Sequence, residues 1–275
     1  MTALQAIILA IVQGITELFP ISSLGHAVIM PKLLGWNVDQ TSDDFLPFLV
    51  VMHLGAAVAL LLYFWRDWFD FLMAVVFRRG PRAAQEGRLF WRVVVATIPA
   101  VILGAGLEHI LRKGFGAPKI AAGFLIANGL MLFVADRWRG RSERSIDQLR
   151  WGDALVIGLW QCLALIPGFS RSGATMAGGY LAGLKHEDAA RFSFLTATPV
   201  ILGATVLEAP KLSHHHSSLG SVAALAGVVA GVVAFISITV LMRWFRAHEE
   251  KGGFTPFAVY CVLAGAGALA WMTFG

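Results

Sequence analysis

The chain has 275 residues, of which 57% are hydrophobic and 14% are charged, and its formal net charge is +5. Soluble domains average roughly 25% charged residues, so the composition excludes an ordinary soluble protein and favours an all-α polytopic membrane protein. The positive charge does not indicate nucleic acid as a partner, because the basic residues lie between apolar runs, where positive charge orients a membrane protein.

Six apolar runs are each long enough to cross about 30 Å of hydrocarbon as a helix. In chain order they cover residues 45–65, 93–111, 120–137, 192–209, 219–242 and 254–274. Two other segments, 1–35 and 152–184, are interrupted at Pro20 and at Pro167, and their apolar arms are too short to cross. Non-helical backbone at membrane depth is tolerated only where protein or a wet cavity covers it. We therefore predict six transmembrane helices plus two re-entrant helix hairpins.

Basic residues are distributed unevenly over the two sides of this layout. Five of the 22 lie on one side, Arg171 lies in the second hairpin, and sixteen lie on the other side, in segments 66–92, 137–150 and 243–251 and at Lys185 and Arg191. Cytoplasmic loops of membrane proteins are rich in lysine and arginine, so the side with sixteen is predicted to be cytoplasmic. Both termini then face outward, the first hairpin enters from outside and the second enters from the cytoplasm.

The layout repeats within a single membrane domain, residues 1–275. Each half, 1–138 and 151–275, holds one hairpin and three spans, and because three is odd the halves have opposite orientations. A Ser-x-x-Gly pattern occurs at residues 22–25 in the first hairpin and at 170–173 in the second. These features predict an inverted repeat whose two hairpin tips correspond.

The tip of the first hairpin carries the polar sequence QGITELFPISSLGH, residues 13–26. Gln13 and Glu17 are four residues apart and share a helix face. Ser23 and His26 are three residues apart and would meet in the first turn of the next helix. A lone buried carboxylate is costly, which indicates a functional role for Glu17. The catalytic candidates are Glu17, Ser23 and His26, and the substrate-binding candidates are Gln13 and Ser22, with helix capping as the alternative role of both serines.

The tip of the second hairpin reads PGFSRSGAT, residues 167–175. Arg171 supplies a permanently charged fork for phosphate oxygens, and the amides that open the following helix also suit an anion. Its glycines allow close approach of the backbone to a ligand, and its hydroxyls offer hydrogen bonds or caps. Arg171 is a catalytic candidate, or else pairs with Glu17 to connect the hairpins. The substrate-binding candidates are Gly168, Ser170, Ser172, Gly173 and Thr175.

Three other polar or reactive residues are expected to have packing roles. His53 lies in the first apolar run and is expected to pack between helices. Cys162 and Cys261 lie in apolar stretches and are expected to be small core residues rather than a disulfide or a metal site.

The two polar sequences together resemble the motifs of the undecaprenyl-diphosphate phosphatase family, also called the bacitracin-resistance protein family. The first family motif reads approximately Glu/Gln-Gly-x-Thr-Glu-Phe-Leu-Pro-x-Ser-Ser-x-Gly-His, and the second reads Pro-Gly-x-Ser-Arg-Ser-Gly-Ala-Thr. The similarity continues through residues 53–56 and 64–66 and covers essentially the whole chain. Gln13 stands where many members carry a glutamate, which removes one negative charge from the first motif.

This resemblance implies an enzyme of the bacterial cytoplasmic (inner) membrane that hydrolyses undecaprenyl diphosphate to undecaprenyl phosphate and inorganic phosphate. Such a reaction recycles the lipid carrier of peptidoglycan synthesis and confers bacitracin resistance. The implied partners are a polyprenyl diphosphate substrate and membrane lipids, and a homodimer is also considered. The outward entry of the first hairpin favours an active site that opens to the external, periplasmic side.

Several mechanisms are compatible with these residues. Arg171 and the hydroxyls and amides of 170–175 would hold the diphosphate, while Ser23, activated by His26, attacks the terminal phosphorus. His26 itself or a water that it activates are alternative nucleophiles. Glu17 would orient His26 or hold a divalent cation, Mg²⁺ or Ca²⁺, that bridges the phosphates.

The alternative function is a lipid-phosphate flippase or transporter, since inverted repeats with broken helices are typical of secondary transporters. A non-catalytic lipid-binding scaffold is a third interpretation, but it leaves Glu17, His26 and Arg171 without a role. Release of phosphate by the purified protein distinguishes the enzyme from both alternatives.

Overall fold

The computed structural model describes residues 1–40, 42, 45–80, 82–114, 117–138, 144–213, 219–248 and 253–274. The regular structure in these ranges is helical, apart from one isolated bridge between Arg144 and Leu184. In chain order the described helices are α1 (Ala3–Thr16), α2 (Ser23–Leu33), α3 (Phe45–Tyr63), α4 (Trp65–Val75), α5 (Ala83–Gly114), α6 (Pro118–Arg137), the short 3-10 helix η1 (Ile146–Gln148), α7 (Trp151–Gln161), the 3-10 helix η2 (Cys162–Leu165), α8 (Arg171–Leu181), α9 (His186–Ser213), α10 (Leu219–Ala247) and α11 (Thr255–Phe274).

Six of the described helices are long and apolar enough to cross a membrane, namely α3, α5, α6, α9, α10 and α11. They coincide with the six apolar runs, which confirms the prediction of an all-helical polytopic membrane protein. Two of them begin earlier than predicted, α5 at Ala83 and α9 at His186, because the helix continues through polar residues that an apolar run does not include. The amphipathic helix α4 was not predicted. Its Asp67 accepts a hydrogen bond of 3.0 Å from Nε of Arg191 in α9.

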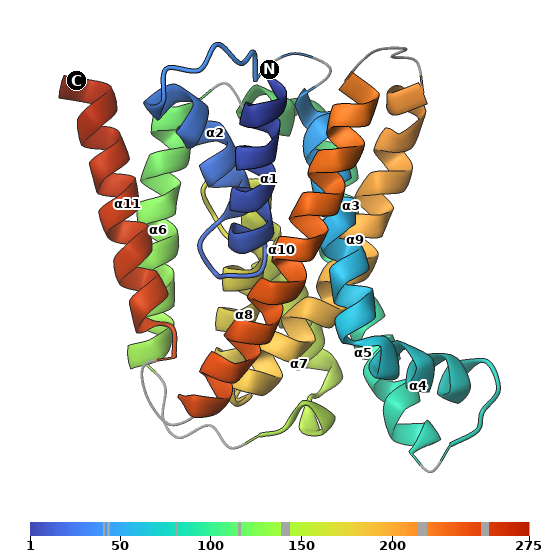
Figure 1. Cartoon of the computed structure of the whole chain (residues 1–275). Coiled ribbons are helices and arrows are strands. Elements are labelled where there is room, and N and C mark those ends of the chain that lie inside the picture. The colour runs from blue at the N-terminus through green and yellow to red at the C-terminus, as the bar shows by residue number, and fades with distance from the viewer. Residues whose placement is uncertain are drawn as a thin grey trace.

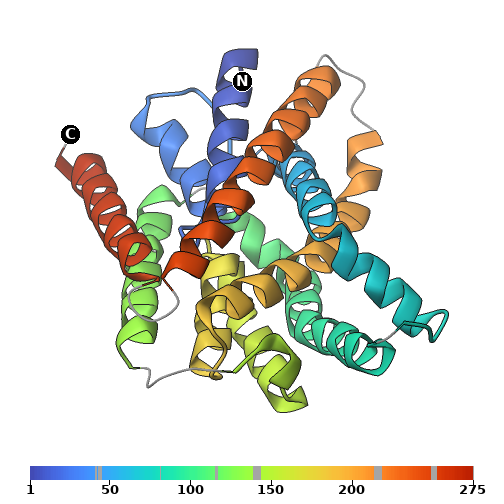
Figure 2. The same cartoon turned by 60° about the horizontal axis from the view of Figure 1, so that its bottom comes forward.

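The bundle has two distinct ends (Figure 1). Both termini lie at one end, and α4, α6, α8 and α10 run to the other end, where α5, α7, α9 and α11 begin. Four of the short helices run along only part of the bundle, α1 and α2 from the end with the termini and α7 and α8 from the opposite end. Figure 2 shows the same arrangement from a second direction. The α1–α2 and α7–α8 turns meet inside the bundle, where Ser22 Oγ donates to Phe169 O at 3.1 Å.

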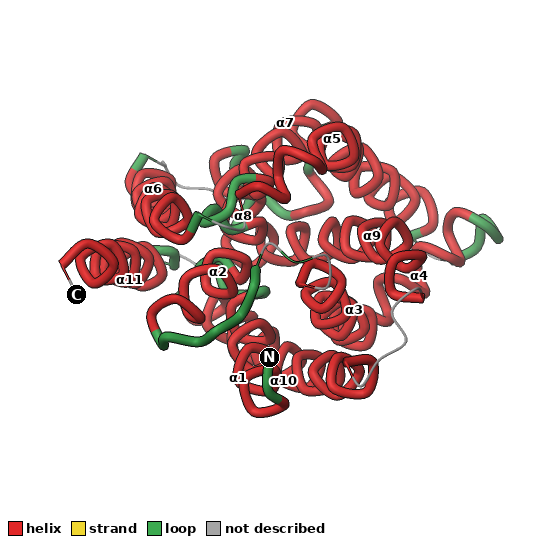
Figure 3. The backbone as a smooth tube through the Cα atoms, turned by 90° about the horizontal axis from the view of Figure 1, so that it is seen from above, coloured by secondary structure: helices red, strands yellow, loops and turns green. Residues whose placement is uncertain are grey.

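Small residues bring the backbones of neighbouring helices into contact. A Cβ at Gly129 of α6 would lie 2.7 Å from the Ala258 oxygen of α11, and a Cβ at Gly265 of α11 would lie 2.7 Å from the Ala122 oxygen of α6. Close packing of this kind favours helix association in lipid. Burial of apolar side chains adds little there, because the lipid tails are equally apolar. Seen along the bundle, α6 and α11 form a pair at its edge, while α2 and α8 lie toward the middle (Figure 3). The two turns are therefore enclosed by helices.

Candidate active site

Each of the two turns leads into a helix that begins with a serine cap. Ser22 Oγ accepts a hydrogen bond of 3.1 Å from the Gly25 amide at the start of α2, and Ser170 Oγ accepts one of 3.1 Å from the Gly173 amide at the start of α8. A serine cap satisfies an amide that has no partner within its helix. The predicted capping role of Ser22 is confirmed, and Ser23, the next residue, is left free to act elsewhere.

Asn128 of α6 holds the two turns together. Its Nδ2 donates to Pro20 O at 3.0 Å, and its Oδ1 accepts from the Ser170 amide at 3.0 Å. Ser172 Oγ adds a third link, because it donates to Phe19 O at 3.0 Å. Sequence reasoning did not single out Asn128. The available signal was an amide side chain in the middle of an apolar run, a position where an unpaired polar group is costly.

The second turn packs against protein backbone more closely than expected. Gly168 has a φ of +107°, and a Cβ there would lie 2.3 Å from the Ala121 oxygen. A Cβ at Gly173 would lie 3.2 Å from the Pro20 oxygen. We predicted that these glycines admit a ligand, but the approach that they permit is between the turn, α6 and the first hairpin. Thr175 Oγ1 is likewise engaged within the protein, with Ser193 of α9 and with Arg171 O.

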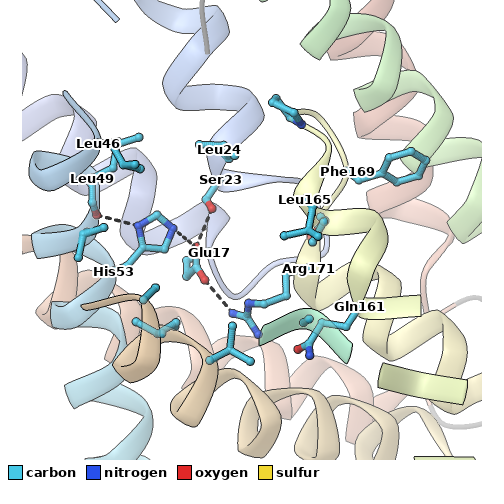
Figure 4. Close-up of a pocket in the computed structure, with 18 residues that line it drawn as sticks. Glu17, Ser23, Leu24, Leu46, Leu49, His53, Gln161, Leu165, Phe169 and Arg171 are labelled. Atoms are coloured by element: carbon cyan, nitrogen blue, oxygen red, sulfur yellow. Dashed lines mark hydrogen bonds and ion pairs between the residues drawn. The ribbon is translucent and has the colours of Figure 1, made fainter. Parts of the chain in front are cut away.

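Glu17 lies at the centre of a cluster of hydrogen-bond donors (Figure 4). Its Oε1 receives Arg171 Nη2 at 2.7 Å, so the alternative role of Arg171, an ion pair that connects the hairpins, is present in the structure. Its Oε2 receives Ser23 Oγ at 2.6 Å and Gln13 Nε2 at 3.0 Å, and His53 Nε2 lies 3.2 Å away. Because the Glu17 side chain is only 4% exposed, these contacts are not screened by bulk water.

His53 belongs to this cluster, which corrects the expectation that it packs between helices. Its Nδ1 lies 2.7 Å from Leu49 O, one turn earlier in α3, while its Nε2 faces Glu17. Leu49 O accepts a hydrogen bond and Glu17 accepts when ionised, so this arrangement favours a proton on each ring nitrogen. In that form His53 and Arg171 both present positive charge to the Glu17 carboxylate. The available sequence signal was a histidine inside an apolar run, at the start of the 53–56 segment of family resemblance.

His26 points away from this cluster, so its predicted pairing with Ser23 is wrong in this structure. His26 Nδ1 lies 2.7 Å from Ser22 O, four residues earlier, and its Nε2 lies 2.8 Å from the Tyr260 hydroxyl of α11. The ring folds back along α2 and stacks on Tyr260. Spacing of three residues placed Ser23 and His26 on one helix face, but the side-chain direction was set by α11. Glu17 takes the place at Ser23 that was expected for the imidazole.

A cavity of about 290 Å³ opens beside the cluster. Its polar part is formed by Glu17, Ser23, His53, Gln161, Ser170 and Arg171. The rest of its wall is apolar and comes mainly from α2, α3, α5, α9 and the α7–α8 turn: Leu24, Leu46, Leu49, Val50, Ala100, Ala164, Leu165, Pro167, Phe169, Val200, Ile201 and Ala204. Such a lining suits a molecule with an anionic head and an apolar tail. Among the predicted substrate-binding residues, Ser170 lines this cavity, whereas Gln13, Ser22, Gly168, Ser172, Gly173 and Thr175 do not.

A divalent cation at Glu17 would share the carboxylate with the donors that already surround it. Oε2 faces Ser23, Gln13 and His53, while Oε1 faces Arg171 and keeps one further lone-pair direction. In the part of the chain that the structure describes, no three His, Cys, Asp or Glu side chains gather as metal ligands. The cation stays a prediction, and the steps derived below do not use one.

Comparison with known proteins identifies the relatives of this chain. The family model described as bacitracin resistance protein BacA matches residues 6–267. An undecaprenyl-diphosphatase from Granulibacter bethesdensis is 52% identical over 290 residues, covering 100% of this chain and 98% of that protein. An undecaprenyl-diphosphatase from Acidiphilium cryptum is 52% identical over 283 residues, covering 100% of both. An undecaprenyl-diphosphatase 2 from Oenococcus oeni is 45% identical and covers 98% of both.

Proposed function

The chain belongs to the bacitracin resistance protein BacA family, and from this premise we propose that it is an undecaprenyl-diphosphatase. It hydrolyses undecaprenyl diphosphate to undecaprenyl phosphate and inorganic phosphate, and so returns the lipid carrier to peptidoglycan synthesis and counteracts bacitracin. The observation that carries this proposal within the molecule is the 2.6 Å hydrogen bond from Ser23 to Glu17 at the polar end of an otherwise apolar cavity. A hydroxyl held by a carboxylate next to two cationic groups is equipped for phosphoryl transfer.

In the proposed first step, Ser23 Oγ attacks the terminal phosphorus. The Oγ–P bond forms while the bond from that phosphorus to the bridging oxygen breaks, and undecaprenyl phosphate leaves with the bridging oxygen. Glu17 takes the serine proton as general base. Arg171 and the His53 imidazolium lie on either side of Glu17 and stabilise the charge on the phosphoryl oxygens.

In the proposed second step, water attacks the phosphoserine. Glu17 has by then released its proton to the departing phosphate or to solvent, and it accepts a proton from the attacking water. The P–Oγ bond breaks, Glu17 gives the proton from water to the departing Oγ, inorganic phosphate leaves and Ser23 is restored. Direct attack of water on the terminal phosphorus, with Glu17 as the base, is the alternative, and attack by His26 would require its ring to leave Tyr260.

Replacing Ser23 with alanine is expected to lower kcat by about 10³-fold, because both the nucleophile and its contact with Glu17 are lost. Ser22→Ala is the matched control, since it removes the neighbouring hydroxyl and a helix cap worth about 1 kcal/mol without touching Glu17. Steady-state phosphate release by both variants makes the comparison. Equal, small losses in the two variants would favour direct attack by water.

The same proposal includes an inverted repeat built from two re-entrant hairpins. It is supported by equivalent contacts between the two halves. The first helix of each hairpin packs against the second long helix of the other half, α1 against α10 and α7 against α5. Gly14 of α1 faces the Ala230 oxygen of α10, and Gly158 of α7 faces the Ala96 oxygen of α5, where a Cβ would lie 2.6 Å and 2.5 Å away. The opposite directions in which the hairpins enter the bundle support it as well (Figure 1).

Location and assembly are also part of the proposal. The protein lies in the bacterial inner membrane with its arginine-rich end in the cytoplasm and both termini outside, as the uneven distribution of arginine and lysine favours. The cavity opens toward the external side. Light scattering of the detergent-purified protein tests the proposed homodimer.

Phosphate release from undecaprenyl diphosphate by detergent-purified protein tests the enzyme against its alternatives. We expect release that follows enzyme concentration, and measurement with EDTA, then with added Mg²⁺ or Ca²⁺, tests the predicted cation. If the folded protein releases no phosphate with any of these ions, the proposal that it is a phosphatase is contradicted. Movement of the lipid between leaflets of liposomes would then support the transporter, which the inverted repeat also suits.

A further inference from the structure

Two residues that line the cavity each hold a buried side-chain atom without a hydrogen-bond partner in the part of the chain that the structure describes. These atoms are Oε1 of Gln161, a hydrogen-bond acceptor, and Nη1 of Arg171, a donor. Gln161 is 2% exposed, and its side chain lies in the same cavity as Arg171 (Figure 4). A buried polar atom without a partner is unfavourable unless a ligand or an ordered water supplies one. The pair therefore indicates a ligand group that both accepts and donates.

The direction of the Gln161 oxygen is fixed by α5. Gln161 Nε2 donates to the Ala96 oxygen at 3.2 Å. Rotating the amide by half a turn would place two oxygens against each other, so only one orientation is favourable. Gly158, one turn earlier on the same face of α7, allows this contact, because a Cβ there would lie 2.5 Å from the same Ala96 oxygen. The backbone contact between α7 and α5 thus fixes the amide with Oε1 unpaired among the described residues, in a side chain that lines the cavity.

We propose that Gln161 determines specificity for a diphosphate with a free terminal phosphate. Its Oε1 accepts a hydrogen bond from the P–OH of a singly protonated terminal phosphoryl group, while Arg171 Nη1 donates to an ionised oxygen of the same group. This inference rests on the proposed phosphatase function and adds the protonation state and the free end of its substrate. Sequence reasoning did not single out Gln161.

The chemistry of the pair explains the selection. An ionised phosphate oxygen only accepts hydrogen bonds, so it is repelled by the amide oxygen of Gln161. A P–OH group instead donates a hydrogen bond to that oxygen. A diphosphate whose terminal phosphate is esterified has no proton at that position and leaves Gln161 Oε1 unpaired. Rejection of a ligand that lacks a required donor is a strong source of specificity, because the buried acceptor then has no partner.

The first test is the pH dependence of kcat/KM for phosphate release from undecaprenyl diphosphate. Measurements run from about pH 5.5 to about pH 8.5, around the second ionisation of a terminal phosphate near pH 6. Gln161→Met is expected to lose about tenfold at the acid end, where the P–OH is present, and less at the alkaline end. Cys162→Ala, in the adjoining η2, is the control for local disturbance. A loss by Gln161→Met that is constant over the whole range would overturn the proposal.

The second test uses a prenyl diphosphate whose terminal phosphate is a methyl ester, as a competitor. Wild type is expected to bind it more weakly than the free diphosphate, and Gln161→Met is expected to reduce this preference. Gln161→Glu keeps an acceptor but loses the donor to Ala96, and it is expected to retain the preference. If wild type and Gln161→Met prefer the free diphosphate over its methyl ester to the same extent, the Gln161 amide has only a structural role and the proposal is overturned.

Binding also separates this inference from the proposed function. If wild type releases no phosphate, the phosphatase proposal fails, but the thermal shift caused by free and methylated diphosphate still tests Gln161. If phosphate is released and neither the pH profile nor the ester preference changes in Gln161→Met, only the inference fails. The unfolding midpoint of each variant in detergent shows that it is folded.

Discussion

Replacing Glu17 with glutamine is expected to lower kcat for phosphate release by about 10³-fold, within the range of a lost general base. Glutamine has nearly the same shape, but its neutral amide does not take the Ser23 proton. Its NH₂ group is itself a donor, and it would face donors that bind a carboxylate oxygen in the wild type. Arg171 and His53 also lose the carboxylate between them. Steady-state kinetics with undecaprenyl diphosphate in detergent measures the loss, and we expect it in kcat more than in KM.

His26→Ala is the informative comparison for this variant. His26 contacts Ser22 O and Tyr260 rather than Ser23, so its loss of activity is expected to be smaller than that of Glu17→Gln. A His26→Ala enzyme as inactive as Glu17→Gln, with an unchanged unfolding midpoint, would contradict Glu17 as the sole base. It would favour the original interpretation in which the imidazole activates Ser23.

Replacing Arg171 with lysine is expected to lower kcat/KM by about 10²-fold, comparable to the loss of one donor to a developing oxyanion. The guanidinium donates through Nη2 to Glu17, while its Nη1 has no partner among the described residues and belongs to a side chain that lines the cavity. One ammonium group does not reproduce this fork, because it is a compact charge on a flexible stem. We expect a higher KM together with a lower kcat, since the same group binds the diphosphate and stabilises the transition state.

Arg191→Lys provides a matched control for the arginine substitution. Arg191 also pairs with a carboxylate, that of Asp67, but it lies outside the cavity between α9 and α4. The same chemical change is therefore expected to leave kcat/KM near wild type. Comparable losses at Arg171 and Arg191 would show that the effect is one of stability rather than of phosphate binding.

Some features of this molecule could be predicted from the sequence, and others could not. The six spans followed from apolar runs, and a functional role for Glu17 followed from the cost of a buried charge, while its pairing with Arg171 was only an alternative. His53 rather than His26 lies beside Glu17, which the sequence did not indicate. Each forms a hydrogen bond to the carbonyl four residues earlier, so local sequence treats them alike, and only the neighbouring helix distinguishes them.

Sequence by itself determined the class of the molecule, its six spans and the two polar tips, because hydropathy and motif identity need no knowledge of contacts. Tertiary structure alone decided which groups meet. Asn128 joins the two turns, His53 reaches Glu17 from α3, and the contact of Gly158 with α5 orients Gln161 toward the cavity. These contacts connect residues of different helices and turns, 36 to 108 positions apart in the sequence. Helix packing in lipid depends on small residues at the interface, and the spacing of small residues along one helix does not reveal which helix packs against it.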